Sequence, residues 1–205
     1  MNPLKLLIGL VPWVLFTLLV RLPGDNTAAY AALAAAALSL VLLLATLKGG
    51  VKVIEAGSVV TFGVLAAVAF LGGPAGNVWV TDYGRATAAF VLAAVMLGST
   101  LLVPFTEQYA RESVPPQYWG SPTFRAVNRK ISGLWGLILL GMGVVHVLAA
   151  IIDPASTSGG FRSGVGGGGL MLNWLIPIGL VFVGITQTKK IAGSAAEPRT
   201  RQVAR

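Results

Sequence analysis

Long apolar runs dominate the pattern of hydrophobic and polar positions along this chain of 205 residues, and short polar stretches separate them. A helix needs about 20 mostly apolar residues to cross the ~30 Å hydrocarbon core of a bilayer. Because lipid offers no hydrogen-bond partner to backbone N–H and C=O groups, each such run must be helical. The pattern predicts an all-α, polytopic transmembrane bundle with six spans, at residues 4–20, 28–47, 52–71, 87–106, 132–152 and 170–187.

Polar sequence outside these runs divides the chain into three parts. We expect a six-helix bundle over residues 1–190, interrupted by a cytoplasmic connector at 107–131 and followed by a basic cytoplasmic tail at 191–205. Lys5 precedes the first run as in a signal peptide, but no small-x-small cleavage site follows, so we expect a retained helix. The glycine-rich stretch 159–169 lacks the ending of a phosphate-binding loop and is expected to be a flexible linker.

Lysine and arginine fall mainly on one side of the predicted bundle. Twelve of the 15 lie in the N-terminal segment, at the loop before the third span, in the connector or after the sixth span. The other three, Arg21, Arg85 and Arg162, lie on the opposite side. Since loops rich in Lys and Arg stay in the cytoplasm, the sequence predicts a multi-pass protein with both termini cytoplasmic.

Composition narrows the class of protein further. Apolar residues make up 55% of the chain and charged residues only 11%, against about 25% charged in soluble domains, which excludes a soluble enzyme. The absence of cysteine excludes disulfides, thiolate metal sites and iron–sulfur clusters. The net charge of +8 lies beside helix ends, where it attracts anionic headgroups, and no nucleic-acid-binding module accompanies it. We expect membrane lipids as partners, and no cofactor, metal or nucleic acid.

A shift of 60 positions aligns the second predicted span with the fourth. The matches that hydropathy alone does not explain pair Thr27 with Thr87, Ser39 with Ser99, and Thr46 with Thr106. We interpret this as two parallel helical-hairpin repeats, in which spans two and three correspond to spans four and five. Parallel repeats occur in transporters, but a duplicated hairpin is also an economical way to build a bundle.

The connector carries the candidate binding residues. Glu107 and Arg111 lie four apart on an expected continuation of the fourth span, and Ser121 before Pro122 is typical of the start of a short helix. Aromatic rings beside cations are typical of the bilayer interface. The candidate lipid- or partner-binding residues are Tyr118, Trp119, Phe124, Arg125, Arg129 and Lys130. The pattern fits a general anchoring belt as well as a docking surface for a protein partner or an anionic lipid.

Three polar residues inside the spans, His146, Glu55 and Asn173, are further candidates because a charge within a membrane is costly to bury. For His146, the only histidine, a neutral ring bonded across helices is the alternative to a proton relay. For Glu55, pairing with Lys52 at the interface is the alternative to coordinating an ion. Asn173 is expected to form a hydrogen bond between helices. Three prolines also lie within predicted spans, Pro12, Pro104 and Pro177.

Two short motifs resemble the intracellular septation protein A family of bacterial inner-membrane proteins. They are Val11-Pro12-Trp13-Val14-Leu15-Phe16, and Ile131-Ser132-Gly133-Leu134-Trp135-Gly136 reached through Phe124-Arg125-x-x-Asn128. The paired-hairpin layout of residues 4–152 is similar too, whereas Ser132 and His146 stand where members often have asparagine and residues 153–205 are additional. The resemblance implies a protein of the bacterial cytoplasmic membrane, without catalysis, that supports envelope organisation or division.

The sequence thus supports two hypotheses of different classes. The first is a non-enzymatic inner-membrane protein that binds partner proteins or anionic lipids at its cytoplasmic face. The second is a small transporter or channel for a proton, an ion or a small solute, and it rests on the repeat, the three prolines and His146. No motif specifies an enzyme, and the oligomeric state is left open.

Overall fold

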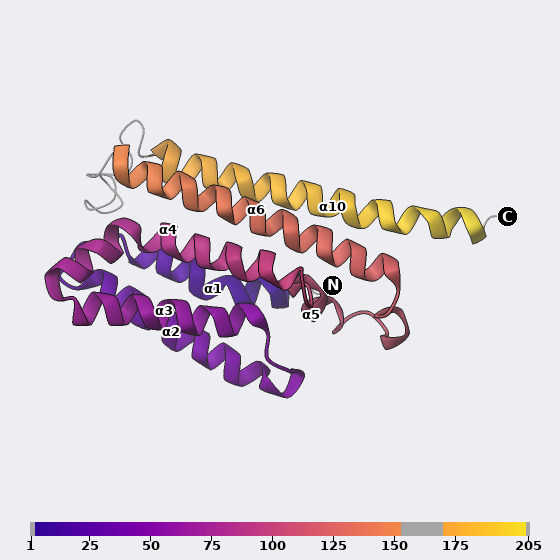
Figure 1. Cartoon of the computed structure of the whole chain (residues 1–205), viewed down its shortest axis with the longest axis horizontal. Coiled ribbons are helices and arrows are strands. Elements are labelled where there is room, and N and C mark those ends of the chain that lie inside the picture. Colours follow the sequence, from indigo (N-terminus) through magenta and orange to yellow (C-terminus); the bar gives the residue numbers. More distant parts are fainter. Residues whose placement is uncertain (1–2, 153–169, 204–205) are drawn as a thin grey trace.

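The chain forms an all-helical bundle in the computed structural model, which describes residues 3–152 and 170–203 (Figure 1). All regular secondary structure within these two ranges is helical. The elements are α1 (Pro3–Leu19), α2 (Thr27–Thr46), the short 3-10 turn η1 (Leu47–Gly49), α3 (Val53–Leu71), α4 (Gly73–Ser99), α5 (Phe105–Ala110), the 3-10 turn η2 (Pro116–Tyr118), α6 (Pro122–Ile152), the π-helical turn η3 (Met171–Leu175) and α10 (Ile176–Val203).

Five of the described helices are long and apolar enough to cross a membrane. They are α2, α3, α4, α6 and the continuous stretch Met171–Ser194 of η3 and α10. The prediction of a polytopic helical membrane protein is therefore confirmed. The first predicted span, residues 4–20, corresponds to α1, whose apolar stretch Ile8–Leu19 is shorter than these five.

The helices lie along one long axis, and helices that are neighbours in the chain run antiparallel (Figure 1). α1 packs against α2, α3 and α4, while α6 packs against α4 and α10 lies on the outer side of α6. We call the end that carries residues 47–52 and 100–121 the connector end. The opposite end, with residues 20–27 and 72–73, is called the arginine end because it contains Arg21.

Aromatic side chains from α1 and α3 fill the middle of the bundle. The ring of Phe62 lies 4.8 Å from that of Trp13 and 5.2 Å from that of Phe16, measured between centroids. The indole N–H of Trp13 donates a 2.6 Å hydrogen bond to Ser58 Oγ. Such packing gains dispersion energy and leaves no polar group unpaired at this point of the core.

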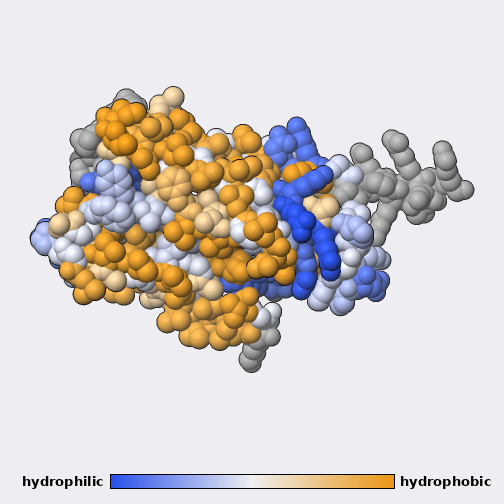
Figure 2. Space-filling model, in the orientation of Figure 1, coloured by the Kyte–Doolittle hydropathy of each residue, from blue (hydrophilic) through white to orange (hydrophobic). Residues whose placement is uncertain are grey.

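The outer surface is apolar over the middle of the molecule. Figure 2 shows hydrophobic residues covering most of the visible face, with strongly hydrophilic residues gathered toward the connector end. Large side chains such as Val60, Leu137 and Phe182 are more than half exposed. An apolar surface of this extent is unsuited to water and matches the hydrocarbon layer of a bilayer.

The fourth helix begins much earlier than predicted. α4 starts at Gly73, so residues 73–86 are helical instead of forming a loop. Gly73 adopts a left-handed φ of 57°, which reverses the chain directly after α3, and Pro74 then occupies the first turn of α4. The first half of α4 contains polar residues of the kind that are common in loops. Two of them, Asn77 and Arg85, are buried in the interior.

The connector also differs from the prediction. α4 ends at Ser99, and α5 is a separate helix that begins after Pro104, so Pro104 lies outside a span and α5 is not a continuation of α4. The helix that begins at Pro122 is not short, because it runs without interruption to Ile152. Within the predicted tail, α10 continues as a helix to Val203. α2 with α3 and α4 with α6 form antiparallel pairs, but their correspondence as repeats stays a prediction.

Candidate functional site

Polar side chains gather at both ends of the bundle. At the connector end, Lys52 is buried at the start of α3, and its ammonium group pairs with Glu112 Oε1 at 2.8 Å. The same ammonium lies 4.6 Å from the ring centroid of Tyr109 on α5. The predicted pairing of Lys52 with Glu55 is therefore not the ion pair that forms, because the connector folds back and brings Glu112 to the lysine.

Glu55 is only 3% exposed, so it does not reach the interface as the pairing prediction required. It faces Gly9 of α1, where a Cβ atom would stand 3.6 Å from Glu55 Oε1 and 2.9 Å from the Tyr109 hydroxyl. The carboxylate of Glu55 and the hydroxyl of Tyr109 therefore both lie next to Gly9. Burial raises the pKa of Tyr109 above its ordinary value, and the nearby carboxylates of Glu55 and Glu112 raise it further.

The predicted pair of Glu107 and Arg111 is confirmed, with Arg111 Nη2 donating to Glu107 Oε1 at 2.6 Å. The guanidinium of Arg111 also lies over the ring of Trp119, 5.2 Å from its centroid. The indole N–H of Trp119 donates a 2.7 Å hydrogen bond to the carbonyl oxygen of Val114. Trp119 therefore holds the connector together from within, and its ring is half-buried.

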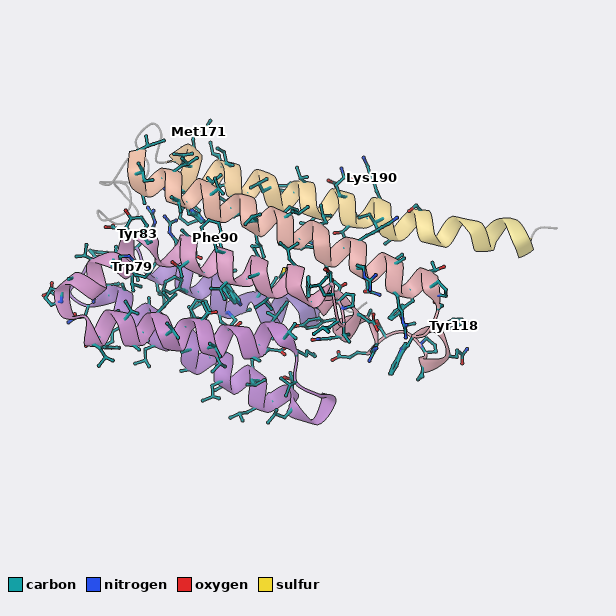
Figure 3. All side chains as sticks on the ribbon, viewed as in Figure 1. Trp79, Tyr83, Phe90, Tyr118, Met171 and Lys190 are labelled. Atoms are coloured by element: carbon teal, nitrogen blue, oxygen red, sulfur yellow. The ribbon has the colours of Figure 1, made fainter. Side chains whose placement is uncertain are left out.

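The other predicted binding residues lie at the start of α6. Ser121 Oγ accepts a 3.2 Å hydrogen bond from the Phe124 N–H, which confirms the predicted helix start. Phe124 is half-buried and Tyr118 is 37% exposed. The three cations Arg125, Arg129 and Lys130 are exposed on the first turns of α6. Figure 3 shows Tyr118 in the connector at this end of the molecule, far from the labelled residues of the other end.

At the arginine end, two buried arginines meet one asparagine. Arg21 Nη2 and Arg85 Nη2 both donate to Asn173 Oδ1, at 2.7 Å and 2.5 Å. Each of the two arginine side chains is 3% exposed, and Asn173 is buried equally deeply. We call these three residues the arginine cluster. Its members come from the end of α1, from α4 and from η3, so it joins three segments that are distant in the sequence.

His146 of α6 is buried beside this cluster. Its ring lies within electrostatic range of Arg85 and Arg21, and its Nδ1 has no hydrogen-bond partner. Three residues before it, Gly143 lets α6 approach α4 so closely that a Cβ would meet the ring of Phe90 at 2.6 Å. Figure 3 shows Phe90 and Tyr83 on the part of α4 that lies near the start of the last helix at Met171.

The π-helical turn η3 places Asn173 in the cluster. A π turn widens the helix by one residue, and such turns are frequent at functional sites. Here the widened turn spans Met171–Leu175, with Asn173 at its centre and buried. The expected hydrogen bond of Asn173 between helices is confirmed, and its partners are two charged groups.

The two arginines were not predicted from the sequence to form a site. Arg21 and Arg85 served only as markers of the outer side, because the fourth span was predicted to begin after Arg85. With α4 starting at Gly73, Arg85 lies in the middle of an apolar helix, which is the signal that could have identified it. Glu112 and Tyr109 were also missed, since only the folded connector brings them to Lys52.

Within the described ranges, no three His, Asp or Glu side chains are grouped so that they could hold a metal ion. The predicted glycine-rich linker at 159–169 lies outside the described residues. Comparison with protein-family models, with curated proteins and with solved structures gives no match to this chain.

Proposed function

We propose that this polytopic membrane protein is non-enzymatic and recruits anionic lipids or a partner protein at its connector end. In this proposal the protein spans the bacterial cytoplasmic membrane six times, with both termini and the connector in the cytoplasm. Its resemblance to the septation protein A family makes support of the cell envelope or of division the cellular role. The observation that carries the proposal is the set of exposed cations at the start of α6.

Arg125, Arg129 and Lys130 are exposed on the first turns of α6. Figure 2 shows strongly hydrophilic residues directly beside the apolar surface toward the connector end. Anionic headgroups attract such cations by about 1 kcal/mol for each one. Lys189 and Lys190 of α10 are exposed toward the same end, which extends the basic region. The side chains of these basic residues can therefore reach headgroup phosphates while their backbone stays helical.

The connector is held firmly, which favours recognition over a loose anchor. Gln108 Oε1 accepts a 3.0 Å hydrogen bond from the Val53 N–H and so caps α3. Thr106 Oγ1 donates to the carbonyl oxygen of Asn128 at 2.9 Å, which ties α5 to α6. A surface that is ordered before binding loses less conformational entropy on binding.

The test compares two sets of cations in the full-length protein in nanodiscs that contain phosphatidylglycerol. Native mass spectrometry counts the lipids that the released protein retains. Neutralising Arg125, Arg129 and Lys130 to Gln should remove retained phosphatidylglycerol, whereas Lys189→Gln with Lys190→Gln should remove much less. An equal loss per charge in both variants would identify a general anchoring belt and contradict a recognition surface.

A photo-crosslinking residue in place of Tyr118 tests for a protein partner in the same region. The matched control carries the crosslinker in place of Leu137, which is 61% exposed on the apolar surface. The proposal expects a defined protein or lipid adduct from position 118 and only bulk lipid from position 137. Identical adducts from both positions would count against a docking surface.

The second candidate function is transport of an ion or a small solute. Buried polar groups at both ends of the bundle favour it, namely Glu55 at one end and the arginine cluster at the other. Between them the interior is filled by Phe16 and Phe62, which are fully buried. This packing supports a scaffold, because a pathway would require those rings to move. Flux through proteoliposomes that falls in His146→Ala and Glu55→Ala would favour transport, and unchanged flux would remove its support.

A further inference from the structure

Two guanidinium groups in the arginine cluster donate to one neutral oxygen, Asn173 Oδ1. Both donate to the same oxygen of Asn173, and both side chains are 97% removed from solvent. The guanidinium of Arg85 remains charged, and the amide oxygen of Asn173 carries no charge that could neutralise it. Buried charges are normally paired with an opposite charge.

The guanidinium of Arg85 has further N–H donors that are buried within the arginine cluster. Its Nε and Nη1 atoms have no hydrogen-bond partner, and together they carry three of the five N–H bonds of the guanidinium. Among the described residues, no carboxylate forms an ion pair with Arg85. Leaving donors of a charged group unmet in the interior is costly, so an arrangement of this kind calls for an acceptor.

The cluster lies toward the arginine end of the bundle. Arg21 follows directly after α1, and Asn173 stands in the first turn of the last helix. His146 is six residues before the end of α6, which corresponds to about 9 Å along the helix. The site is therefore close to the bundle end, although its side chains are buried among α1, α4, α6 and η3.

We propose that Arg21, Arg85 and Asn173 form a binding site for a phosphate group, with His146 at its border. Planar guanidinium groups bind phosphate oxygens with paired, charge-assisted hydrogen bonds. Several oxygens on one phosphate can accept the free N–H bonds of Arg85 together with a bond from Arg21, which a single neutral oxygen cannot do. A free phosphate and a phosphomonoester lipid headgroup share this chemistry.

The experiment measures thermal unfolding of the full-length protein in maltoside micelles, which contain no phosphate. One arm adds inorganic phosphate, with acetate and chloride at equal ionic strength as controls, and the other adds phosphatidic acid to the micelles. A ligand that binds only the folded state raises the unfolding temperature, and the rise grows with the ratio of its free concentration to its Kd. The variants are Arg85→Gln and, as the control at an exposed position of the connector, Ser113→Ala.

We expect phosphate or phosphatidic acid to stabilise the wild type and Ser113→Ala to the same degree. In Arg85→Gln the apparent affinity should fall by about 10- to 100-fold, as for loss of hydrogen bonds from a charged donor. Stabilisation by inorganic phosphate identifies a soluble anion as the ligand, and stabilisation by phosphatidic acid alone identifies a headgroup.

Equal stabilisation of the wild type and Arg85→Gln would overturn the proposal, because binding would then occur elsewhere. Absence of any shift in the wild type in both arms would overturn it as well. If Arg85→Gln does not fold, Arg85→Lys keeps a positive charge but loses the planar fork, and it should bind phosphate more weakly than the wild type. The two proposals can fail separately, because Arg85→Gln leaves the connector cations Arg125, Arg129 and Lys130 unchanged.

Discussion

Glycines of the same helix differ in how much space surrounds the position of a Cβ atom, although each has the same hydropathy value. On α6, a Cβ at Gly136 would stand 2.6 Å from Leu97 Cγ of α4, whereas a Cβ at Gly133 would meet nothing within 4 Å. Small residues allow membrane helices to approach closely and gain van der Waals contact. The close approach of α4 and α6 therefore requires a glycine at position 136 but not at position 133.

Replacing Gly136 with alanine should destabilise the protein by about 1–3 kcal/mol, because the added methyl group would force α4 and α6 apart. Gly133→Ala is the matched control, and it should be neutral or stabilise by up to about 1 kcal/mol through higher helix propensity. Thermal or denaturant unfolding in detergent micelles compares the two. Equal effects of both variants would show that the contact with Leu97 does not limit the packing.

Tyr109 is the residue whose ionisation responds most to its surroundings outside the membrane-spanning helices. Because burial, Glu55 and Glu112 raise its pKa above the ordinary value, the folded protein should keep the Tyr109 proton at about pH 11. Ultraviolet titration of tyrosinate should then give the same absorbance per molecule for the wild type and Tyr109→Phe at that pH. A tyrosinate signal that Tyr109→Phe lacks would contradict this.

The same shift links stability to pH. The unfolded chain releases this proton near pH 10, while the folded chain retains it, so the contribution of Tyr109 is complete below about pH 10 and declines as the pH rises further. The free energy of unfolding of the wild type should therefore fall more steeply above pH 10 than that of Tyr109→Phe.

At the scale of elements, the short helix α5 is fastened to α6 by side-chain hydrogen bonds. Ser132 Oγ accepts a 3.3 Å hydrogen bond from the Thr106 N–H and lies 2.9 Å from Thr106 Oγ1. Both residues are fully buried. A helix of six residues has little stability of its own, so this contact decides where the connector lies.

Ser132→Ala should cost about 1–3 kcal/mol, because it leaves the buried Thr106 N–H without its acceptor. The control is Ser113→Ala, at an exposed position of the connector, and it should change stability by less than about 0.5 kcal/mol. Hydrogen exchange of residues 105–110 gives a local readout. Unchanged protection of α5 in Ser132→Ala would contradict its role in fastening the connector.

Hydropathy predicted the all-helical membrane fold, because a span needs only length and apolar composition. It placed the start of α4 wrongly, since polar side chains that face the interior look the same in sequence as those of a loop. Asn173 and His146 were recognised as candidates, as single polar residues in apolar runs. Their meeting with Arg21 and Arg85 depends on the tertiary fold and on the π turn, neither of which has a sequence pattern of its own.

At the scale of the whole molecule, each loop within residues 3–152 lies at one of the two ends of the bundle. The chain has no cysteine, so single introduced cysteines report sidedness without background. An impermeant maleimide should label Gly49→Cys and Asn26→Cys from opposite sides of a sealed vesicle, since the two residues lie at opposite ends. Labelling of both from the same side would contradict a membrane-spanning α2.

The side of the N-terminus then tests whether α1 crosses the membrane. In the bundle α1 begins at the connector end (Figure 1), so an N-terminal tag should be accessible from the same side as Gly49→Cys. An N-terminus on the side of Asn26→Cys would mean that α1 does not cross. The six-span proposal fails in that case, whereas the five long helices are unaffected.

The position of α1 also has a consequence for biogenesis. α1 leaves the ribosome before α3 and α4, yet its buried face packs against both of them. Phe16, for example, contacts Phe62 and lies where Gly84 leaves room for its ring. During synthesis α1 must therefore wait, inserted but incompletely packed, until about the first hundred residues have entered the membrane, because the chain grows from its N-terminus at a finite rate. A nascent chain arrested between α3 and α4 would expose this aromatic face, and quality-control proteases would recognise it as unfinished.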